Sequence, residues 1–473
     1  MSIVKHVLAD DGKTDENKAD ETVEHERDNS IEDKREKELK TETESKDTDK
    51  VETKKAGTEN LTIYVTVGFG VLVAVIIVTN IYSYRHKNAQ SQLDSNERHL
   101  LYRSSFMNNT YDNPGSVATM ECHIDRIVNL SKDIKSQVRL LPYDWKREIS
   151  RTSFKILEEI GSGNFGFVCK GELYGLYGPN STTEVAIKSV NGSFDGSHLM
   201  DLLQEIKIMG HIKPHINLVS MIGSCRSDLE TTGDLWLLLE FCHHGDLKSY
   251  LTKNEKQILG GSEEDAINSR CLIKWAYDIS KGMEYLSAKK IMHGDLAARN
   301  ILLDHNPVEN AYPVARVADY GLSKRFYDNV CYAKEERLYV PWKWLAYEFL
   351  TKNIFTLASD VWSYAVVVWE ILSFGRIPYG HQEYMDVVKQ VEGGYRLPCP
   401  TDIDKITRWS PQMLYEELSK VCFLAEPDDR ASFEDVTSII EKQLTEDEIS
   451  EYREMEDKYQ NNRANNYLRI GQN

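Results

Sequence analysis

The stretch HGDLAARN, residues 293–300, follows a long segment whose apolar residues recur at helical spacing. It places Asp295 five residues before Asn300 in a polar loop. An aspartate in such a loop can accept a proton, and an asparagine side chain offers a hard oxygen to a metal ion. Gly294, directly before the aspartate, adds a residue with unusual backbone freedom. The stretch therefore predicts a loop that carries chemistry, placed after a long helix.

A second acidic position lies further along the chain. Asp319-Tyr320-Gly321 follows the apolar run ARVA, residues 315–318. The carboxylate of Asp319 and the amide of Asn300 are both hard oxygen donors, which suit a Mg²⁺ ion that also bridges nucleotide phosphates. The sequence therefore predicts a magnesium site made by Asn300 and Asp319.

A glycine-rich stretch, GSGNFGFV at residues 161–168, fits the pattern G-x-G-x-x-G-x-V. Alone it is a weak signal, because the same glycine spacing opens dinucleotide-binding helices. Here it lies between two strand-like runs, which favours a hairpin that covers phosphates with backbone N–H groups. Lys188 ends the β-branched run VAIK, and Glu205 lies on a predicted helix. A lone lysine at a strand end is usually a solvated charge, but a lysine with such a carboxylate predicts phosphate binding.

Residues 154–444, more than 60% of the chain, together resemble the protein kinase catalytic domain. The resemblance is narrower, to receptor-type tyrosine kinases, because of DLAARN at residues 295–300 and PWKW at residues 341–344. The motif SDVWS at residues 359–363 agrees with it. The resemblance implies an α+β class and a bilobal protein kinase fold, with a β-rich N-lobe and a helical C-lobe. Strand-like runs in the first third and helical periodicity afterwards fit that expectation.

The resemblance assigns a role to each matching residue. Asp295 would accept the proton of the substrate phenol, in a catalytic set with Arg299 and Asn300. Lys188, oriented by Glu205, would hold the α- and β-phosphates of ATP. The implied cofactors are ATP and Mg²⁺, with Mn²⁺ as an alternative metal. The implied nucleotide-binding residues are Ile160, Gly161, Ser162, Gly163, Asn164, Phe165, Gly166, Val168, Ala186, Lys188, Glu240, Cys242 and Leu302.

Some of these implied contacts are more specific. Glu240 and Cys242 would bind adenine through their backbone, in front of Leu239. Glu348 would form a buried ion pair with Arg430. Between Asp319 and Glu348 the chain carries three tyrosines, which are either self-phosphorylation sites or packing residues: Tyr327, Tyr332 and Tyr339.

Several positions depart from the family pattern. Tyr320 replaces the phenylalanine of D-F-G, Tyr347 replaces the proline of A-P-E, and Trp342 enlarges the residue expected beside the substrate tyrosine. Gly294 replaces an arginine that in relatives grips a phosphorylated side chain, and it is expected to loosen the loop by roughly 0.5–1 kcal/mol. Because the base, metal and phosphate residues are present, the favoured function is an active ATP-dependent protein-tyrosine kinase. The alternative is a catalytically silent pseudokinase scaffold.

The remainder of the chain predicts a membrane protein. Residues 1–60 are acidic and contain no aromatic residue, cysteine or proline, so they are expected to form a disordered extracellular segment; a charged helix is the alternative. Residues 61–82 carry no charge and would be roughly 33 Å long as a helix, which favours one transmembrane helix over a buried core helix. Residues 83–153 are expected to be a cytosolic juxtamembrane segment, and residues 445–473 an acidic, Asn-rich tail that is helical at first and then loose.

The expected location is the cell membrane, crossed once, with the N-terminus outside and the kinase domain in the cytosol. Charges near the span do not decide this orientation, but the eight irregularly spaced cysteines fit reduced cytosolic thiols. The net charge of −18 argues against nucleic acid as a partner. Expected partners are protein substrates with tyrosines, a co-receptor or second copy, and phosphotyrosine-reading adaptors at Tyr452, Tyr459 and Tyr467. The layout is similar to that of short-ectodomain receptor-like tyrosine kinases of nematodes.

Overall fold

The computed structural model describes residues 141–163, 166–190, 196–227, 229, 234–262, 265–320, 341–406 and 409–467. These residues all belong to one compact unit of the chain. The expectations for residues 1–140, which include the acidic segment and the apolar run, lie outside the described residues, as do those for Asn164, Phe165 and the three tyrosines of residues 321–340. Across the ranges that are described, no helix is both long enough and apolar enough to cross a membrane.

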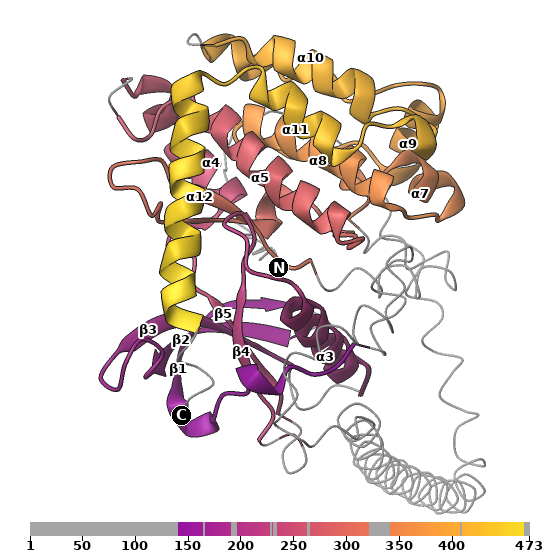
Figure 1. Ribbon diagram of the computed structural model, residues 1–473. Helices are drawn as coiled ribbons and strands as arrows, with labels where there is room; N and C mark the ends of the chain where they lie inside the picture. Colours follow the sequence, from indigo (N-terminus) through magenta and orange to yellow (C-terminus); the bar gives the residue numbers. More distant parts are fainter. Residues whose placement is uncertain are drawn as a thin grey trace, which may run out of the picture. The chain divides into compact units, whose positions relative to one another are not determined.

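The first lobe is built on a five-stranded antiparallel sheet with the order β1-β2-β3-β5-β4. Apolar side chains of the sheet form a small core that includes Phe154, Val185, Ile187 and Leu238. Helix α3 contacts β4 (Figure 1). The elements are β1 (Phe154–Gly163), β2 (Gly166–Tyr174), β3 (Thr182–Ser189), α3 (Gly196–His211), β4 (Met221–Cys225) and β5 (Trp236–Glu240).

The second lobe is helical, with one small three-stranded sheet of order β6-β7-β8. Helix α8 lies at its centre, because most of its side chains are buried and most of these are apolar, Trp362 and Tyr364 among them. In its first turn, Ser359 Oγ accepts a 2.9 Å bond from the backbone N–H of Thr356, the residue directly before the helix. The elements are β6 (Gly245–Asp246), α4 (Leu247–Gly260), α5 (Cys271–Ala288), β7 (Ile301–Asp304), β8 (Val314–Val317), α7 (Tyr347–Lys352), α8 (Leu357–Leu372), α9 (Tyr384–Glu392), α10 (Pro411–Cys422) and α11 (Phe433–Glu441).

A sheet lobe followed by a helical lobe is the bilobal kinase fold, so the expected α+β architecture is confirmed. The six cysteines whose side chains are described are unpaired thiols, as the sequence predicted: Cys169, Cys225, Cys242, Cys271, Cys399 and Cys422.

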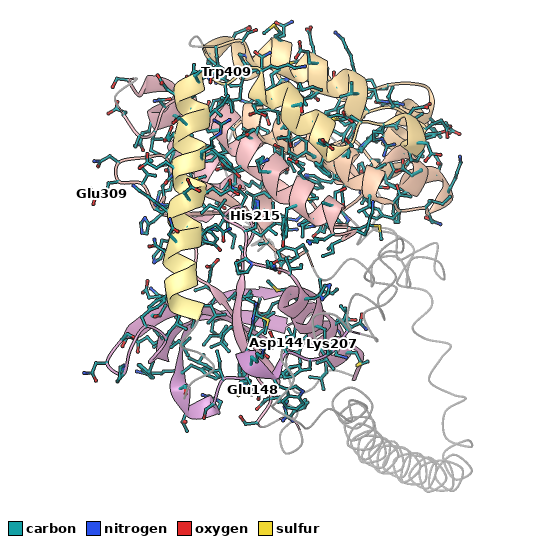
Figure 2. The ribbon with its side chains drawn as sticks, viewed as in Figure 1. Asp144, Glu148, Lys207, His215, Glu309 and Trp409 are labelled. Atoms are coloured by element: carbon teal, nitrogen blue, oxygen red, sulfur yellow. The ribbon has the colours of Figure 1, made fainter. Side chains whose placement is uncertain are left out.

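The segment directly before β1 packs on the sheet lobe. Tyr143 is 1% exposed, and its hydroxyl lies 2.7 Å from Ser224 Oγ on β4. Glu148 forms a parallel bridge with Ser224, and the close approach of this segment leaves no room for a Cβ at Gly223. Figure 2 shows Asp144 and Glu148 beside the sheet. Residues 141–153, placed in the juxtamembrane segment from the sequence, thus contact the sheet lobe directly.

A long C-terminal helix, α12 (Glu446–Tyr467), follows α11 and runs from the helical lobe towards the sheet lobe (Figure 1). The sequence predicted a helix only over the acidic part, and the helix continues through the Asn-rich part to Tyr467. Tyr452 is 4% exposed and Tyr459 is 6% exposed. The expectation that these two tyrosines are surface docking sites is therefore wrong for this structure, because both side chains are buried against the kinase domain.

Candidate active site

The site is organised around Lys188 near the end of β3. Its ammonium nitrogen lies 2.8 Å from Glu205 Oε1 of α3 and 2.7 Å from Asp319 Oδ1, just after β8. The sheet positions the lysine, because Lys188 pairs with Val168 of β2 on one side and with Leu237 of β5 on the other. The structure therefore brings together three residues that lie far apart in the sequence, and it joins the two lobes through one charged group.

Burial and charge act in opposite directions on this cluster. Burial alone would lower the pKa of Lys188, but the neighbouring carboxylates of Asp319 and Glu205 outweigh it and raise that pKa above its usual range. Burial alone would raise the pKa of Asp319, but the Lys188 ammonium outweighs it and holds that pKa well below its usual range. Lys188 is therefore a cation and Asp319 a carboxylate at neutral pH.

The loop that opened the sequence analysis folds around Asp295. One carboxylate oxygen accepts a 2.5 Å bond from the guanidinium of Arg299, and the other accepts a 2.9 Å bond from Asn300 Nδ2. Asn300 Nδ2 also donates to the backbone carbonyl of Asp295 at 2.6 Å. These two partners hold the orientation of the carboxylate, while about a quarter of the side chain remains exposed. A carboxylate held in this way and still reachable can receive a proton from a bound hydroxyl group.

Buried side chains from elsewhere hold this loop in place. Asp360, near the start of α8, accepts a 2.7 Å bond from the backbone N–H of His293 and a 2.9 Å bond from that of Gly294. His293 is fully buried, and its Nε2 lies 2.9 Å from the carbonyl oxygen of Ala318. Ala318, directly before Asp319, is thereby hydrogen-bonded to His293, two positions before Asp295. The carboxylates of Asp295 and Asp319 are thus fixed relative to each other.

Gly294 has a backbone φ of +81°, in the left-handed region. A residue with a Cβ is strained there, whereas glycine is not. The expectation of a looser loop did not include this conformation. In the folded loop, glycine relieves backbone strain at the position where its N–H is held by Asp360.

Tyr320 replaces phenylalanine at the residue after Asp319, and its hydroxyl makes a bond that phenylalanine lacks. The hydroxyl donates 2.8 Å to the carbonyl oxygen of Val219, and the side chain is 3% exposed. The N–H of Val219 in turn donates 2.9 Å to the carbonyl oxygen of Val317 on β8. The substitution that looked conservative in the sequence therefore adds a bond after Asp319, to the same residue whose backbone already holds Val317 before it.

Asn300 and Asp319 fit a divalent metal ion bound together with phosphates. Both amide-nitrogen contacts of Asn300 go to Asp295, so the amide oxygen is directed to the other side. Asp319 is ionised, with Oδ1 on Lys188. Mg²⁺ takes one or two protein oxygens and completes its shell with phosphates and water. In the described part of the chain no cluster of three or more His, Cys, Asp or Glu ligands forms a metal cage, and such a cage is not what this chemistry requires.

The expected nucleotide-binding residues lie on the two lobes around the hinge after β5. Val219, Cys242 and Ala318 form a small buried apolar cluster, with Leu239 and Leu302 packed on it. Ala186 pairs with Leu239 in the sheet, and Val168 pairs with Gly161 across the glycine-rich hairpin. Ile160 is 43% exposed, and Ser162 is exposed, as a flap over a ligand would be. Gly163 and Gly166 pair with each other at the tip of the hairpin.

Cys242 and Glu240 differ from each other in where their side chains lie. Burial raises the pKa of the Cys242 thiol to about 12, so it is an apolar wall group and not a nucleophile. The carboxylate of Glu240 turns to the rear of the hinge, where the guanidinium of Arg316 lies 2.7 Å away. The side chain of Glu240 is thus used within the protein, which agrees with the expectation that its backbone binds adenine.

The expected ion pair between Glu348 and Arg430 is confirmed. Two parallel bonds of 3.0 and 2.9 Å join the carboxylate to the guanidinium, and the side chains are 4% and 0% exposed. Ser359 donates a further 2.6 Å bond to Glu348. Removal of one partner from such a buried pair typically costs about 3–5 kcal/mol.

Two supporting residues had no role assigned from the sequence. Asp360 was noted only as part of the motif SDVWS, although it holds two backbone N–H groups of the catalytic loop. Glu370 accepts bonds of 2.8 Å from the N–H of Ala298 and from the indole of Trp344. The signal that could have found both is the presence of carboxylates inside a helix that is otherwise apolar nearly all round.

Comparison with known proteins agrees with this geometry. The model of the family described as "Protein tyrosine and serine/threonine kinase" matches residues 154–440. A fibroblast growth factor receptor of Ciona intestinalis is 31% identical over 342 residues, which cover 70% of this chain and 42% of that receptor. The tyrosine kinase receptor Cad96Ca of Drosophila melanogaster is 32% identical over 302 residues, which cover 63% of this chain and 36% of that protein.

Fibroblast growth factor receptor 1 of Pleurodeles waltl is 30% identical over 405 residues, which cover 81% of this chain and 46% of that receptor. The chain thus spans less than half the length of these three relatives. The matched family segment contains Lys188, Glu205, Asp295, Asn300 and Asp319, the residues that meet in the site. With its fold, its site and this match in agreement, the chain belongs to the protein tyrosine and serine/threonine kinase family.

Proposed function

We propose that the chain is a membrane-anchored, receptor-like protein-tyrosine kinase that transfers the γ-phosphate of ATP to tyrosine residues of proteins. The observation that carries the proposal is Lys188, whose ammonium lies 2.8 Å from Glu205 and 2.7 Å from Asp319 at the same time. This is the arrangement in which a lysine can hold nucleotide phosphates beside a metal-binding carboxylate. It is formed here although Gly294 stands in place of arginine.

The residues divide the chemistry between them. Asp295 accepts the phenolic proton as the substrate oxygen forms a bond to the γ-phosphorus, while the bond from that phosphorus to the leaving ADP oxygen breaks. Lys188 binds the α- and β-phosphates, and the N–H groups of the glycine-rich hairpin cover them. A Mg²⁺ ion held by Asn300 and Asp319 would neutralise charge on the phosphates, and Mn²⁺ has the same ligand preference.

Tyrosine as the acceptor is supported by the surroundings of Arg299. Its guanidinium lies 4.5 Å from the ring centroid of Trp344 in the PWKW segment and 2.5 Å from the Asp295 carboxylate. The arginine of the loop at residues 293–300 is thus in direct contact with the segment that we propose to bind the substrate tyrosine, residues 341–344. The relative named as a tyrosine kinase receptor points the same way.

The membrane part of the proposal rests on the chain outside the described residues. The uncharged run at residues 61–82 supports one span, with the N-terminus outside and the kinase domain in the cytosol, where ATP is available. Relatives named as receptors are consistent with a second copy or a co-receptor as the activating partner. Among the tail tyrosines, Tyr467 remains the proposed adaptor site, with Ile470 three positions further on.

A second candidate function is a nucleotide-binding scaffold without transfer activity, and Gly294 is the observation that favours it. Incubation of the purified full chain with Mg-ATP and poly-Glu/Tyr, and in parallel with a Ser/Thr peptide, separates these functions. We expect phosphotyrosine to form and phosphoserine and phosphothreonine to stay at background. ATP binding without any phosphotyrosine would support the scaffold and overturn the proposed transfer activity.

A further inference from the structure

We propose that α12 is a positioning element of the kinase domain, and that Tyr452 and Tyr459 hold the rear of the hinge in the conformation that binds ATP. The proposal rests on the proposed kinase activity, because it concerns the nucleotide-binding hinge of that same site. It assigns the C-terminal helix to the catalytic unit and not to a free signalling tail.

Three buried residues lie on one narrow face of α12. The helix is strongly polar, yet Tyr452, Met455 and Tyr459 recur at a spacing of three and four residues and therefore lie on one face. All three are buried, with exposures of 4%, 0% and 6%. Among the side chains of α12 that the structure describes, these three are the buried apolar ones, so they and the polar contacts of the helix hold its position.

Tyr452 holds the connection between α3 and β4. Its hydroxyl donates a 2.7 Å bond to Asn217 Oδ1, and Asn217 is fully buried. The amide nitrogen of Asn217 donates 3.1 Å to the carbonyl oxygen of Ala315 on β8. The backbone carbonyl of Asn217 accepts a 2.8 Å bond from the N–H of Val317. Tyr452 is thereby linked through one asparagine to the strand that leads directly to Asp319.

Tyr459 contacts the hinge itself. Its hydroxyl lies 3.1 Å from Ser220 Oγ and donates weaker bonds of 3.4 and 3.5 Å to the carboxylate oxygens of Glu240. The guanidinium of Arg316 lies 5.2 Å from the centroid of the Tyr459 ring and 2.7 Å from Glu240. One tyrosine thus joins the hinge residue Glu240 to Arg316 on β8, a strand of the helical lobe.

Ion pairs fix the first half of α12 on the helical lobe. Arg270 binds both carboxylate oxygens of Glu448, and Lys274 Nζ lies 2.7 Å from Glu451. Asn306 donates to the sulfur of Met455 at 3.2 Å. The helical lobe therefore fixes the position of this half of α12. Tyr459, in a later turn of the same helix, contacts the hinge from that fixed position. Separation of the lobes would require Tyr459 to leave Ser220 or Arg316.

The structure in which α12 is docked is also the one in which Lys188 contacts Glu205 and Asp319. Docking of α12 therefore accompanies an assembled site, which makes the helix a supporting element and not an inhibitory one. A buried tyrosine hydroxyl contributes an amount typical of one hydrogen bond, and its loss leaves the buried Asn217 oxygen with one partner fewer. We expect loss of these hydroxyl groups to lower the affinity for ATP, because the two tyrosines hold the hinge and not the catalytic loop.

The test is the double variant Tyr452→Phe/Tyr459→Phe in the full chain, which keeps both rings and removes both hydroxyls. The KM for ATP should rise about three- to tenfold, the size of one to two ordinary hydrogen bonds, with kcat changed by less than about twofold. Amide hydrogen exchange in residues 215–222 and 237–243 should become faster by a similar factor. Hydrogen exchange can be measured without catalysis. It therefore distinguishes failure of the proposed role of α12 from failure of the proposed kinase activity.

The matched control is Tyr415→Phe in α10. The Tyr415 hydroxyl also donates 2.8 Å to a backbone carbonyl, that of Leu397, and the side chain is 2% exposed. This variant should leave both the KM for ATP and the exchange of the hinge at wild-type values. If the double variant matches wild type in KM and in hinge exchange, the two hydroxyls do not position the hinge and the proposal is overturned. Equal changes in the double variant and in Tyr415→Phe would overturn it as well.

Discussion

The catalytic loop and the α12 contact differ in how they are encoded. The loop at residues 293–300 is a short segment in which Arg299 and Asn300 meet Asp295 within five residues. The α12 contact joins Tyr452 to Asn217 and Tyr459 to Ser220, pairs that are separated by more than 200 residues. The comparison shows that the orientation of Asp295 is set by its neighbours in the sequence, whereas the α12 contact depends on parts of the chain that only the fold brings together.

Because the two regions have different roles, we expect substitutions in the catalytic site to lower activity more than substitutions in the α12 contact. In the proposed function, residues of the catalytic site contact the phosphates and the reacting oxygen, so we expect their loss to act on the chemical step itself. Residues of the α12 contact act through the hinge, so their loss acts on nucleotide binding by a smaller factor. Substitutions that preserve volume allow the two regions to be compared directly.

Among the next three variants, the largest effect is expected for Asp319→Asn in the catalytic site, which keeps the shape of the side chain and removes its charge. Asp319 is the carboxylate that Lys188 and the proposed metal ion share. We expect kcat to fall about 10²- to 10³-fold, as for loss of one preorganised electrostatic group. Steady-state kinetics over a Mg²⁺ titration measures this. If kcat of Asp319→Asn falls no further than kcat of Tyr452→Phe/Tyr459→Phe, the two regions do not differ in role as we propose.

The next largest effect is expected for Gly294→Ala. At a φ of +81° a Cβ is strained, so the free energy of unfolding should fall by about 1–2 kcal/mol. Urea denaturation measures the difference. The matched control is Gly260→Ala at the end of α4, where no heavy atom within 4 Å would meet the added Cβ. That control should leave stability unchanged or raise it, and equal losses in the two variants would show that strain at Gly294 is not the cause.

A smaller effect is expected for Tyr320→Phe. The variant restores the common family residue but removes the hydroxyl that donates 2.8 Å to Val219. The free energy of unfolding should fall by about 1 kcal/mol, since one buried hydrogen bond is lost while the ring remains. Thermal and urea unfolding of the two proteins give this number. An unchanged stability would mean that the hydroxyl bond adds nothing and that the tyrosine acts only as an aromatic packing residue.

Much of the site could be predicted because its chemistry restricts the residue types. Only a few side chains bind phosphate, hold Mg²⁺ or accept a proton, so Lys188, Asn300 and Asp319 stand out by type and spacing. The pairing of Lys188 with Glu205 follows from the kinase resemblance, and the structure contains it. The contact of Lys188 with Asp319 was not predicted. The lobes could be predicted because a sheet core and an apolar helix such as α8 have different periodicities.

The rest could not be predicted, for physical reasons that differ from residue to residue. The strain relief at Gly294 depends on a backbone angle that composition does not reveal. Tyr452 and Tyr459 look like exposed residues of a polar tail, because the sequence does not say which surface covers them. The same holds for Tyr143, whose burial depends on β4 lying against residues 141–153.

The central claim is that the catalytic site is complete and works without an arginine at position 294. Asp295→Asn tests it most directly, because the variant keeps the shape of the loop and removes the proton acceptor. The measurement is the rate of phosphotyrosine formation on poly-Glu/Tyr by the full chain with Mg-ATP, for wild type and for the variant. We expect wild type to transfer phosphate and Asp295→Asn to be slower by about 10²- to 10⁴-fold, the usual contribution of a positioned acid or base. Equal rates in the two proteins would contradict the account.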